Sequence, residues 1–196
     1  MARLSQQIEK EFKNLLTKEE YEQLLTTLQL NEDEAIQQTN IYFDTATHLL
    51  KNKNMGLRIR LFDDSGELTL KSPISENEKL ETTDELDLET ATKMADKGSI
   101  NLDGHVADKL AEFGINISDL EPIGRLSTLR YTFPGKGGMY FLDESYYQDQ
   151  KDYELEFETE DVESGKFQFE QFLAKHHIKK RKTAQKIARM LNYPNK

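Results

Sequence analysis

Short segments in which apolar and polar residues alternate recur along most of this chain, and they constrain its fold more than any other feature. Successive side chains of a β-strand point to opposite faces, so a period of two indicates a strand with one packed face and one polar face. In the first such segment, Ile8 and Phe12 share one face. The other face carries three charged residues, Glu9, Glu11 and Lys13. The pattern therefore predicts a protein built mainly from amphipathic strands.

Turn sequences and helical patterns separate these strands. Thr17 and Glu20 form a capping-box pattern that begins a helix. Further helices are expected in two short stretches between 89 and 118, at 165–176 and at 183–191, and hairpin turns at 63–66 and 134–138. The predicted strands are 8–13, 40–45, 55–62, 67–71, 80–88, 126–133, 139–145 and 153–159. We therefore expect one α+β domain over residues 1–196, with a mainly antiparallel sheet that is either open or closed into a barrel.

Composition excludes several classes of protein. The 196 residues include 36 Asp and Glu but only 26 Lys and Arg, which gives a net charge of −10 and argues against nonspecific binding of nucleic acid. The absence of Cys excludes disulfide scaffolds, thiolate metal sites and cysteine nucleophiles. No apolar run approaches the roughly 20 residues that span a bilayer, and the first residues do not resemble a secretory signal. We expect a cytoplasmic protein without a membrane partner.

The polar strand faces carry charges of both signs. On any one strand such a face is most simply explained as the side that faces solvent. If the sheet closes with its apolar faces outward, however, the charges meet in a lumen, where they need partners or ligands. Carboxylates from two strands would suit Mg²⁺ or Mn²⁺, and Arg and Lys side chains would suit phosphate oxygens. The residues on these faces are Glu9, Glu11, Lys13, Arg58, Arg60, Thr69, Lys71, Glu154, Glu156 and Glu158.

An ExExK motif at Glu9–Lys13 resembles the signature of the CYTH superfamily, the triphosphate tunnel metalloenzymes, which include class IV adenylate cyclases and thiamine triphosphatases. The matches that follow it in order are Tyr42–Thr45, Leu57–Arg60, Thr69–Lys71, Leu129–Arg130, Leu142–Asp143 and Glu154–Glu156. The resemblance covers nearly the whole chain. It implies a closed tunnel of eight antiparallel strands that takes an anionic small molecule, a triphosphate, and hydrolyses it with Mg²⁺ or Mn²⁺.

The resemblance also implies a role for each matching residue. The metal ligands would be Glu9, Glu11, Asp143, Glu154 and Glu156. The residues that hold phosphate oxygens would be Lys13, Arg58, Arg60, Lys71 and Arg130. The family has a further acidic residue after its third group of strand residues, and Glu81 and Glu85 both compete for that place. Arg125 lies an odd number of residues from Arg130 and is therefore expected on the opposite face.

The C-terminal segment supplies further candidates. Lys182, Lys186 and Arg189 have the spacing of one helical stripe, which is typical of a solvated helix face as well as of a binding surface. The resemblance matches Lys186 to a functional lysine on the last helix. We expect Lys186, together with Lys71, to be catalytic. We also expect Lys182 and Lys186 to bind substrate. The four histidines lack metal-ligand spacing and are predicted to be surface residues: His48, His105, His176 and His177.

The leading hypothesis is metal-dependent hydrolysis of a triphosphate, with inorganic tripolyphosphate as the first choice of substrate. Thiamine or nucleoside triphosphate hydrolysis and cyclisation of ATP are related alternatives. A polyphosphate or nucleotide sensor without turnover is an alternative of a different class, as is an acidic β-domain without a ligand. The sequence leaves the oligomeric state open between monomer and homodimer.

Overall fold

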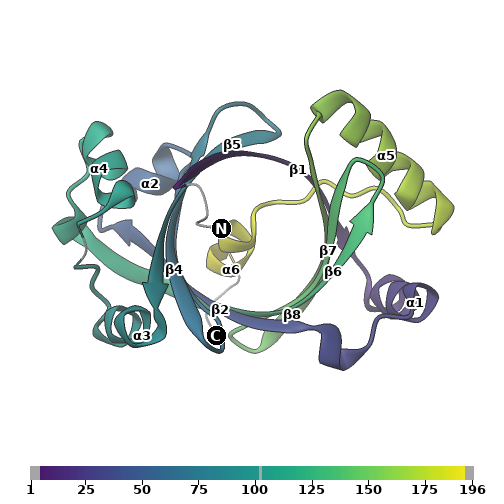
Figure 1. Cartoon of the computed structure of the whole chain (residues 1–196), viewed down its shortest axis with the longest axis horizontal. Coiled ribbons are helices and arrows are strands. Elements are labelled where there is room, and N and C mark those ends of the chain that lie inside the picture. The colour runs from purple at the N-terminus through teal and green to yellow at the C-terminus, as the bar shows by residue number, and fades with distance from the viewer. Residues whose placement is uncertain (1–4, 102, 193–196) are drawn as a thin grey trace. The chain divides into compact units, whose positions relative to one another are not determined.

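A computed structural model describes residues 5–101 and 103–192 of the chain. Its strands form a closed antiparallel barrel in the order β1-β5-β4-β3-β2-β6-β7-β8, which confirms the predicted α+β class (Figure 1). The strands are β1 (Gln6–Leu16), β2 (Ile36–Thr45), β3 (Gly56–Leu61), β4 (Ser65–Pro73), β5 (Glu78–Asp87), β6 (Leu120–Gly135), β7 (Gly138–Tyr147) and β8 (Gln150–Thr159). The described α-helices are α1 (Lys18–Leu28), α2 (Leu49–Asn52), α3 (Leu88–Lys97), α4 (His105–Glu112), α5 (Val162–Lys175) and α6 (Lys186–Asn192). Short 3₁₀ turns lie at Glu32–Glu34 and Ile117–Asp119.

The chain divides into two compact units. Unit 1 contains the described residues up to 8, those from 38 to 126, and those from 186 onward. Unit 2 contains residues 9–37 and 127–185. The single domain expected over 1–196 includes residues 1–4, 102 and 193–196, which lie outside the described part of the chain. Among the described helices, none combines the length and apolarity needed to cross a membrane.

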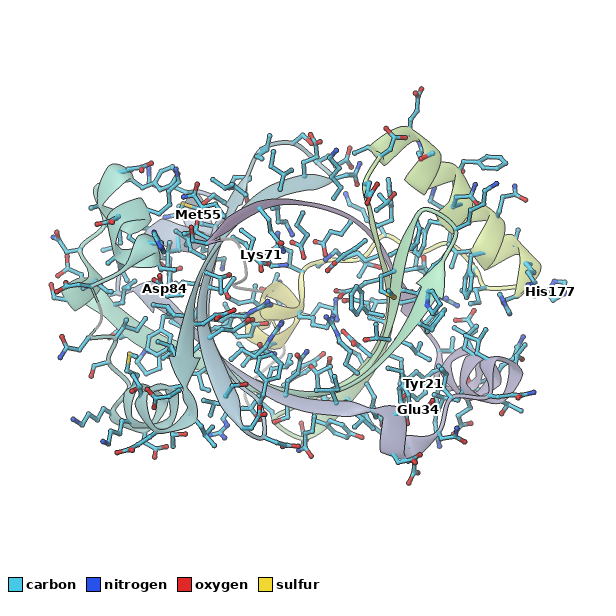
Figure 2. The ribbon with its side chains drawn as sticks, viewed as in Figure 1. Tyr21, Glu34, Met55, Lys71, Asp84 and His177 are labelled. Atoms are coloured by element: carbon cyan, nitrogen blue, oxygen red, sulfur yellow. The ribbon has the colours of Figure 1, made fainter. Side chains whose placement is uncertain are left out.

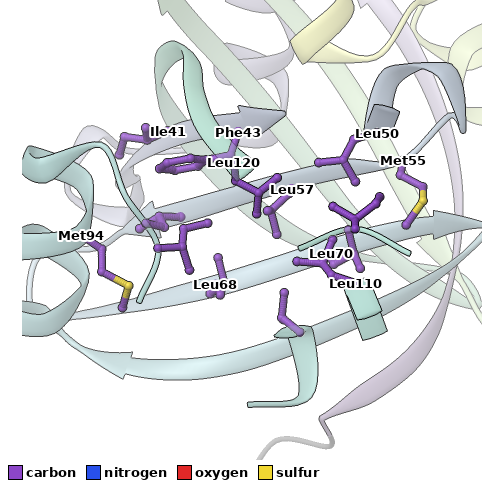
Figure 3. Close-up of a cluster of buried hydrophobic side chains, with 14 of the residues drawn as sticks. Ile41, Phe43, Leu50, Met55, Leu57, Leu68, Leu70, Met94, Leu110 and Leu120 are labelled. Atoms are coloured by element: carbon purple, nitrogen blue, oxygen red, sulfur yellow. The ribbon is translucent and has the colours of Figure 1, made fainter. Parts of the chain in front are cut away.

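The core of unit 1 forms where the apolar faces of β3 and β4 pack beneath α3 and α4 (Figure 3). Leu57 and Ile59 are fully buried there, together with Leu68 and Leu70 on the neighbouring strand, as the alternation predicts. Figure 2 places Lys71 on the opposite side of this sheet from Met55. Since a single face of each strand supplies the core, the other face is left for polar groups.

Two buried or half-buried aspartates fasten connecting segments to unit 1. The Asp44 carboxylate accepts hydrogen bonds from the backbone N–H groups of Thr45, Leu50 and Lys51 at 2.8–3.0 Å. On β5, Asp84 accepts from the N–H groups of His105 and Val106 at the start of α4, at 3.0 and 2.9 Å (Figure 2). Both carboxylates satisfy backbone donors that a short helix cannot satisfy itself, so their role is structural.

Unit 2 has its own core between the apolar faces of β6, β7 and β8 and the helices α1 and α5. Aromatic rings dominate this core: the Tyr140 ring lies 4.3 Å from the rings of both Phe157 and Phe172, centroid to centroid. Helix α1 begins after Thr17, and the predicted capping box is confirmed by reciprocal bonds between Thr17 and Glu20 of 3.2 and 2.8 Å. The predicted hairpin turns lie between β3 and β4 and between β6 and β7, but the first is tighter than the expected 63–66 because β4 already begins at Ser65.

Two expectations about the C-terminal segment are wrong. The last helix begins at Lys186 rather than 183, and the Thr183 hydroxyl, in the non-helical segment before it, accepts a hydrogen bond from the backbone N–H of Leu15 at 2.8 Å. Lys182 therefore does not share a helical stripe with Lys186 and Arg189. Helix α5 begins at Val162, three residues earlier than expected, because Asp161 caps it through a 2.7 Å bond from the Ser164 N–H.

His176 is also not a surface residue. Only 5% of it is exposed, and its ring lies 4.5 Å from that of Phe172. The Gln23 side chain of α1 donates to its carbonyl oxygen at 3.2 Å, which holds the end of α5 against that helix. Burial, together with nearby Lys175 and His177, lowers the pKa of the His176 imidazole. The other three histidines are exposed, as predicted.

The packing of unit 1 leads to a first prediction. Replacing Ile59 with Asp places a carboxylate in a fully buried apolar cluster, so the chain should lose its cooperative thermal unfolding transition. The matched control is Ile36→Asp, because Ile36 also lies on a strand but is 54% exposed. That variant should melt within a few degrees of the parent by circular dichroism. A folded Ile59→Asp variant would contradict the assignment of this face to the core.

A second prediction concerns Glu20, which holds the segment before α6. Its carboxylate accepts from the Arg181 guanidinium at 2.8 and 3.1 Å, and from the backbone N–H groups of Thr17 and Lys179. Burial would raise the pKa of the Glu20 carboxyl, but these bonds outweigh it and the net shift is downward from 4.5. The resulting stability is present above that pH and is lost as the pH falls through the lower folded value.

Glu20→Gln should therefore reduce the free energy of unfolding by about 1 kcal/mol at pH 7. Denaturant titration at several pH values should show this difference shrinking as the pH falls below 4.5, where Glu20 is first protonated in the unfolded state, and vanishing below the lower folded pKa, where it is protonated in both states. Glu22→Gln is the control on the same helix, because Glu22 is 59% exposed. A loss of stability that does not depend on pH would contradict the role of the ionised carboxylate.

Candidate active site

In unit 2, the face of the strands opposite the aromatic core is charged. The register sets Lys13 of β1 beside Glu156 of β8, and Glu154 of β8 beside Asp143 of β7. Arg130 of β6 lies beside Asp143. Antiparallel neighbours in register present their side chains on the same face, so four successive strands bring these charges together. This face contains several of the acidic and basic residues that the sequence motifs single out.

Arg130 is the centre of this face. Its Nε and Nη2 atoms donate to the two oxygens of Asp143 at 2.7 and 2.6 Å, and Nη2 also donates to Glu156 Oε2 at 2.6 Å. The guanidinium lies over the Phe141 ring, 4.6 Å from its centroid. Burial lowers the pKa of Arg130, but the charges of Asp143 and Glu156 raise it by more, and the net shift is well upward. The two ion pairs therefore favour the charged form of the guanidinium.

The carboxylates of Asp143, Glu154 and Glu156 form a group that could hold a cation. Each offers one oxygen, and these oxygens lie within 4.8 Å of one another. All three residues are buried, and Asp143 and Glu154 are fully so. Hard oxygen donors from two adjacent strands are the ligands that Mg²⁺ and Mn²⁺ prefer. The chemistry and spacing of this donor set therefore fit a divalent metal.

The other predicted ligands, Glu9 and Glu11, are buried on β1 but do not belong to this group of three within the described residues. Glu11 instead lies 2.8 Å from Lys13 Nζ, whose distance to Glu156 is 3.8 Å. Lys13 thus lies between two carboxylates and is held closest to Glu11. The geometry separates a group that could bind a cation from a neighbouring ion pair.

Unit 1 carries a second charged face, opposite its core. Arg58 and Arg60 both lie on this face of β3, and the Arg60 guanidinium donates from Nε to Asn40 Oδ1 at 2.9 Å. Arg60 Nη1 also lies 3.2 Å from Glu67 Oε1. Glu67 is buried and was not a candidate from the motifs. The observed register of the β3–β4 hairpin sets Leu61 opposite Gly66 and Arg60 opposite Glu67, whereas counting back from the expected turn at 63–66 would have placed Thr69 opposite Arg60. The signal that could have found Glu67 is alternation, which puts it on the same face of β4 as Thr69 and Lys71.

Glu81 and Glu85, the two candidates for the family's further acidic residue, have different environments. Glu81 is buried, and Lys71 Nζ lies 3.3 Å from its carboxylate. The Thr83 hydroxyl donates to Glu81 at 3.4 Å. Glu85 is exposed, although it lies on the same strand face. Of the two, Glu81 is the residue that shares a site with a candidate phosphate-binding lysine.

The C-terminal candidates have different environments. Lys186 is the first residue of α6 and is half-buried, as is Arg189 one turn later. Lys182 is exposed and belongs to unit 2, whereas Lys186 belongs to unit 1. Arg125, expected on the opposite face from Arg130, is exposed.

The strands of this closed antiparallel barrel carry buried carboxylates and basic side chains opposite their apolar faces. Barrels of this class have side chains suited to binding metals and polyanions. The CYTH domain family model matches residues 7–191. The chain therefore belongs to the CYTH domain family, as its motifs predicted.

Individual relatives agree with this assignment. The chain is 37% identical over 187 residues to a Bacillus subtilis protein named "Putative triphosphatase YjbK", with 95% of each chain covered. A solved structure of a putative adenylate cyclase from Bacillus halodurans is 34% identical, with a TM-score of 0.91, covering 96% of this chain and 100% of the other. HpAC1 of Hippeastrum, described as a putative adenylyl cyclase with a dominant triphosphatase activity, is 26% identical with a TM-score of 0.73. That similarity covers 92% of this chain and 93% of HpAC1.

Proposed function

We propose that this protein hydrolyses a triphosphate with the help of a divalent metal ion, and that inorganic tripolyphosphate is its substrate. The observation that carries the proposal is the buried group of Asp143, Glu154 and Glu156, with Arg130 bound to two of its members. Three buried carboxylates are costly without cationic partners, and a divalent metal ion would provide such a partner. The basic residues beside them would in turn suit the oxygens of a polyphosphate. The names of two similar proteins, YjbK and HpAC1, include triphosphatase activity and support the same class of reaction.

The metal ligands in this proposal are Asp143, Glu154 and Glu156, with Glu9 and Glu11 as further carboxylates on β1. A divalent cation bound there would neutralise charge on phosphoryl oxygens and so lower the barrier to attack on phosphorus. The carboxylates hold no substrate themselves, since their charge repels phosphate. Their task is to fix the cation, and the strand register of β7 and β8 sets their spacing.

The basic residues would bind and orient the phosphate chain. Lys13, Arg58, Arg60 and Arg130 hold phosphoryl oxygens in this proposal, and Arg guanidinium groups can do so with two parallel N–H donors. Lys71 and Lys186 would stabilise the charge that develops as the phosphoric anhydride bond breaks. A water molecule in line with that bond attacks phosphorus, and the products are phosphate and the shortened chain. Lys182 is exposed and would contribute only to attracting the anion.

Substrate identity needs a direct test. Purified chain should be incubated with tripolyphosphate, thiamine triphosphate, ATP or pyrophosphate in the presence of Mg²⁺ or Mn²⁺, and phosphate release and cyclic AMP should both be measured. We expect tripolyphosphate to give the highest rate. Cyclic AMP as the main product would support the cyclase alternative suggested by the name of the Bacillus halodurans protein. Binding of all four compounds without turnover would leave a sensor as the better interpretation.

The third prediction concerns the carboxylates. Glu154→Gln and Glu156→Gln preserve size but remove a negative charge, so activity should fall by about 10²-fold or more, and excess Mn²⁺ should restore part of it. Relief of repulsion among the carboxylates should keep the metal-free melting temperature from falling. Glu158→Gln is the control, because Glu158 lies on the same strand face outside the group of three. Equal and negligible losses at all three positions would remove the metal from the mechanism.

The fourth prediction concerns the basic face of unit 1. Arg58→Ala and Arg60→Ala should each lower kcat/KM for tripolyphosphate by about 10²-fold, because both guanidinium groups are needed to offset charge in the transition state. Arg125→Ala is the control, since Arg125 is an exposed arginine of the same unit. Its activity should stay within about twofold of the parent, as expected for a surface substitution. Full activity of either test variant would contradict its assignment to phosphate binding.

A further inference from the structure

Arg130 occupies the position where a cation bound to the carboxylate group would be expected. Its Nη2 atom lies 2.6 Å from both Asp143 Oδ2 and Glu156 Oε2, which are two of the three residues in that group. The guanidinium reduces the formal charge of the three carboxylates from −3 to −2. A neighbouring charge of this kind stabilises buried carboxylates while no other cation is present.

The guanidinium is held firmly in this position. Its strand sets it beside Asp143, two parallel bonds bind it to that carboxylate, and the Phe141 ring lies against it. The bond to Glu156 is different, because it uses the same Nη2 atom and reaches two strands away, to β8. Lys13 does not replace it, because Lys13 Nζ is 3.8 Å from Glu156 and closer to Glu11. The Glu156 contact is therefore the one that can be exchanged without breaking the Asp143 pair.

We infer that Arg130 is the internal counter-cation of the metal-free carboxylate group, and that an entering divalent metal ion displaces it from Glu156. This inference rests on the metal site of the proposed function, and it gives Arg130 a role in setting the affinity of that site for the metal ion. The N–H group released from Glu156 becomes available to a phosphoryl oxygen while Nε stays bonded to Asp143. Metal entry would thus prepare the anion site, and the two ligands would bind with positive coupling.

The physical consequence is competition. A guanidinium and a divalent cation repel each other strongly at short range in a buried site, so Arg130 should weaken metal binding when no triphosphate is present. If Arg130 only held the carboxylates in position, its removal would instead weaken metal binding. The two roles predict opposite signs for the same substitution.

The test is isothermal titration of the full chain with Mn²⁺ in the absence of triphosphate. Arg130→Gln should bind Mn²⁺ at least about tenfold more tightly than the parent, because one competing charge has been removed. Lys151→Gln is the matched control. Lys151 is also a cation of unit 2, but it pairs with Glu144, outside the group of three, at 2.8 Å. Its Mn²⁺ affinity should stay within about twofold of the parent. Equal or weaker binding by Arg130→Gln would overturn the inference.

A second measurement follows Arg130 in the parent chain, without a substitution in the protein that is titrated. In a ¹⁵N spectrum of the arginine side chains, the Arg130 signal, assigned by its loss in Arg130→Lys, should shift as Mg²⁺ saturates the parent chain. An unchanged signal while calorimetry records Mg²⁺ binding would overturn the displacement, even if Arg130→Gln fails to fold. Failure to bind either metal, in parent and variant, would also overturn it.

The proposed function can fail separately. Mn²⁺ binding that responds to Arg130→Gln as expected, together with no hydrolysis of any triphosphate, would support the inference and reject the enzyme. Hydrolysis of tripolyphosphate by the parent chain, with metal affinity unaffected by Arg130→Gln, would do the reverse.

Discussion

The structure depends on accommodating acidic side chains inside a folded protein. Burial removes water from Asp143, Glu154 and Glu156, and an uncompensated charge there would cost several kcal/mol. Arg130 offsets part of this cost through three short hydrogen bonds. The same solution recurs in unit 1, where Lys71 lies against buried Glu81. Such pairs contribute little to stability by themselves, but they allow acidic and basic side chains to be buried together on one strand face.

Stability must come from the other face of the same strands. In unit 1, Ile59 and Leu68 pack with helices α3 and α4, and in unit 2 Tyr140 packs against aromatic residues of β8 and α5. These strands therefore contribute to the core with alternate residues and to a polar or charged face with the residues between. Because a shift of register by one residue would exchange the two faces, burial of the apolar face also fixes where the charges lie.

Local patterns predicted much of this arrangement. The capping box of Thr17, the two hairpin turns and the burial of Ile59 all follow from interactions between residues close in sequence or from a period of two. The charged faces follow from the same period, and the order of short motifs along the chain led to the family. The start of the last helix was harder to predict from local patterns. The hydrogen bond from the Leu15 N–H to the Thr183 hydroxyl joins residues far apart in sequence, and Thr183 lies outside that helix.

The sequence by itself determined which residues share a strand face, since side-chain alternation is a property of the backbone of one strand. Only the tertiary structure decided which of those residues meet. The register between strands set Lys71 against Glu81, paired Glu67 with Arg60, and joined Asp143 and Glu156 through Arg130. Packing between α1 and α5 buried His176 in the same way. Pairing across strands depends on long-range contacts whose free energy is shared by the whole sheet, and no short segment of sequence contains that information.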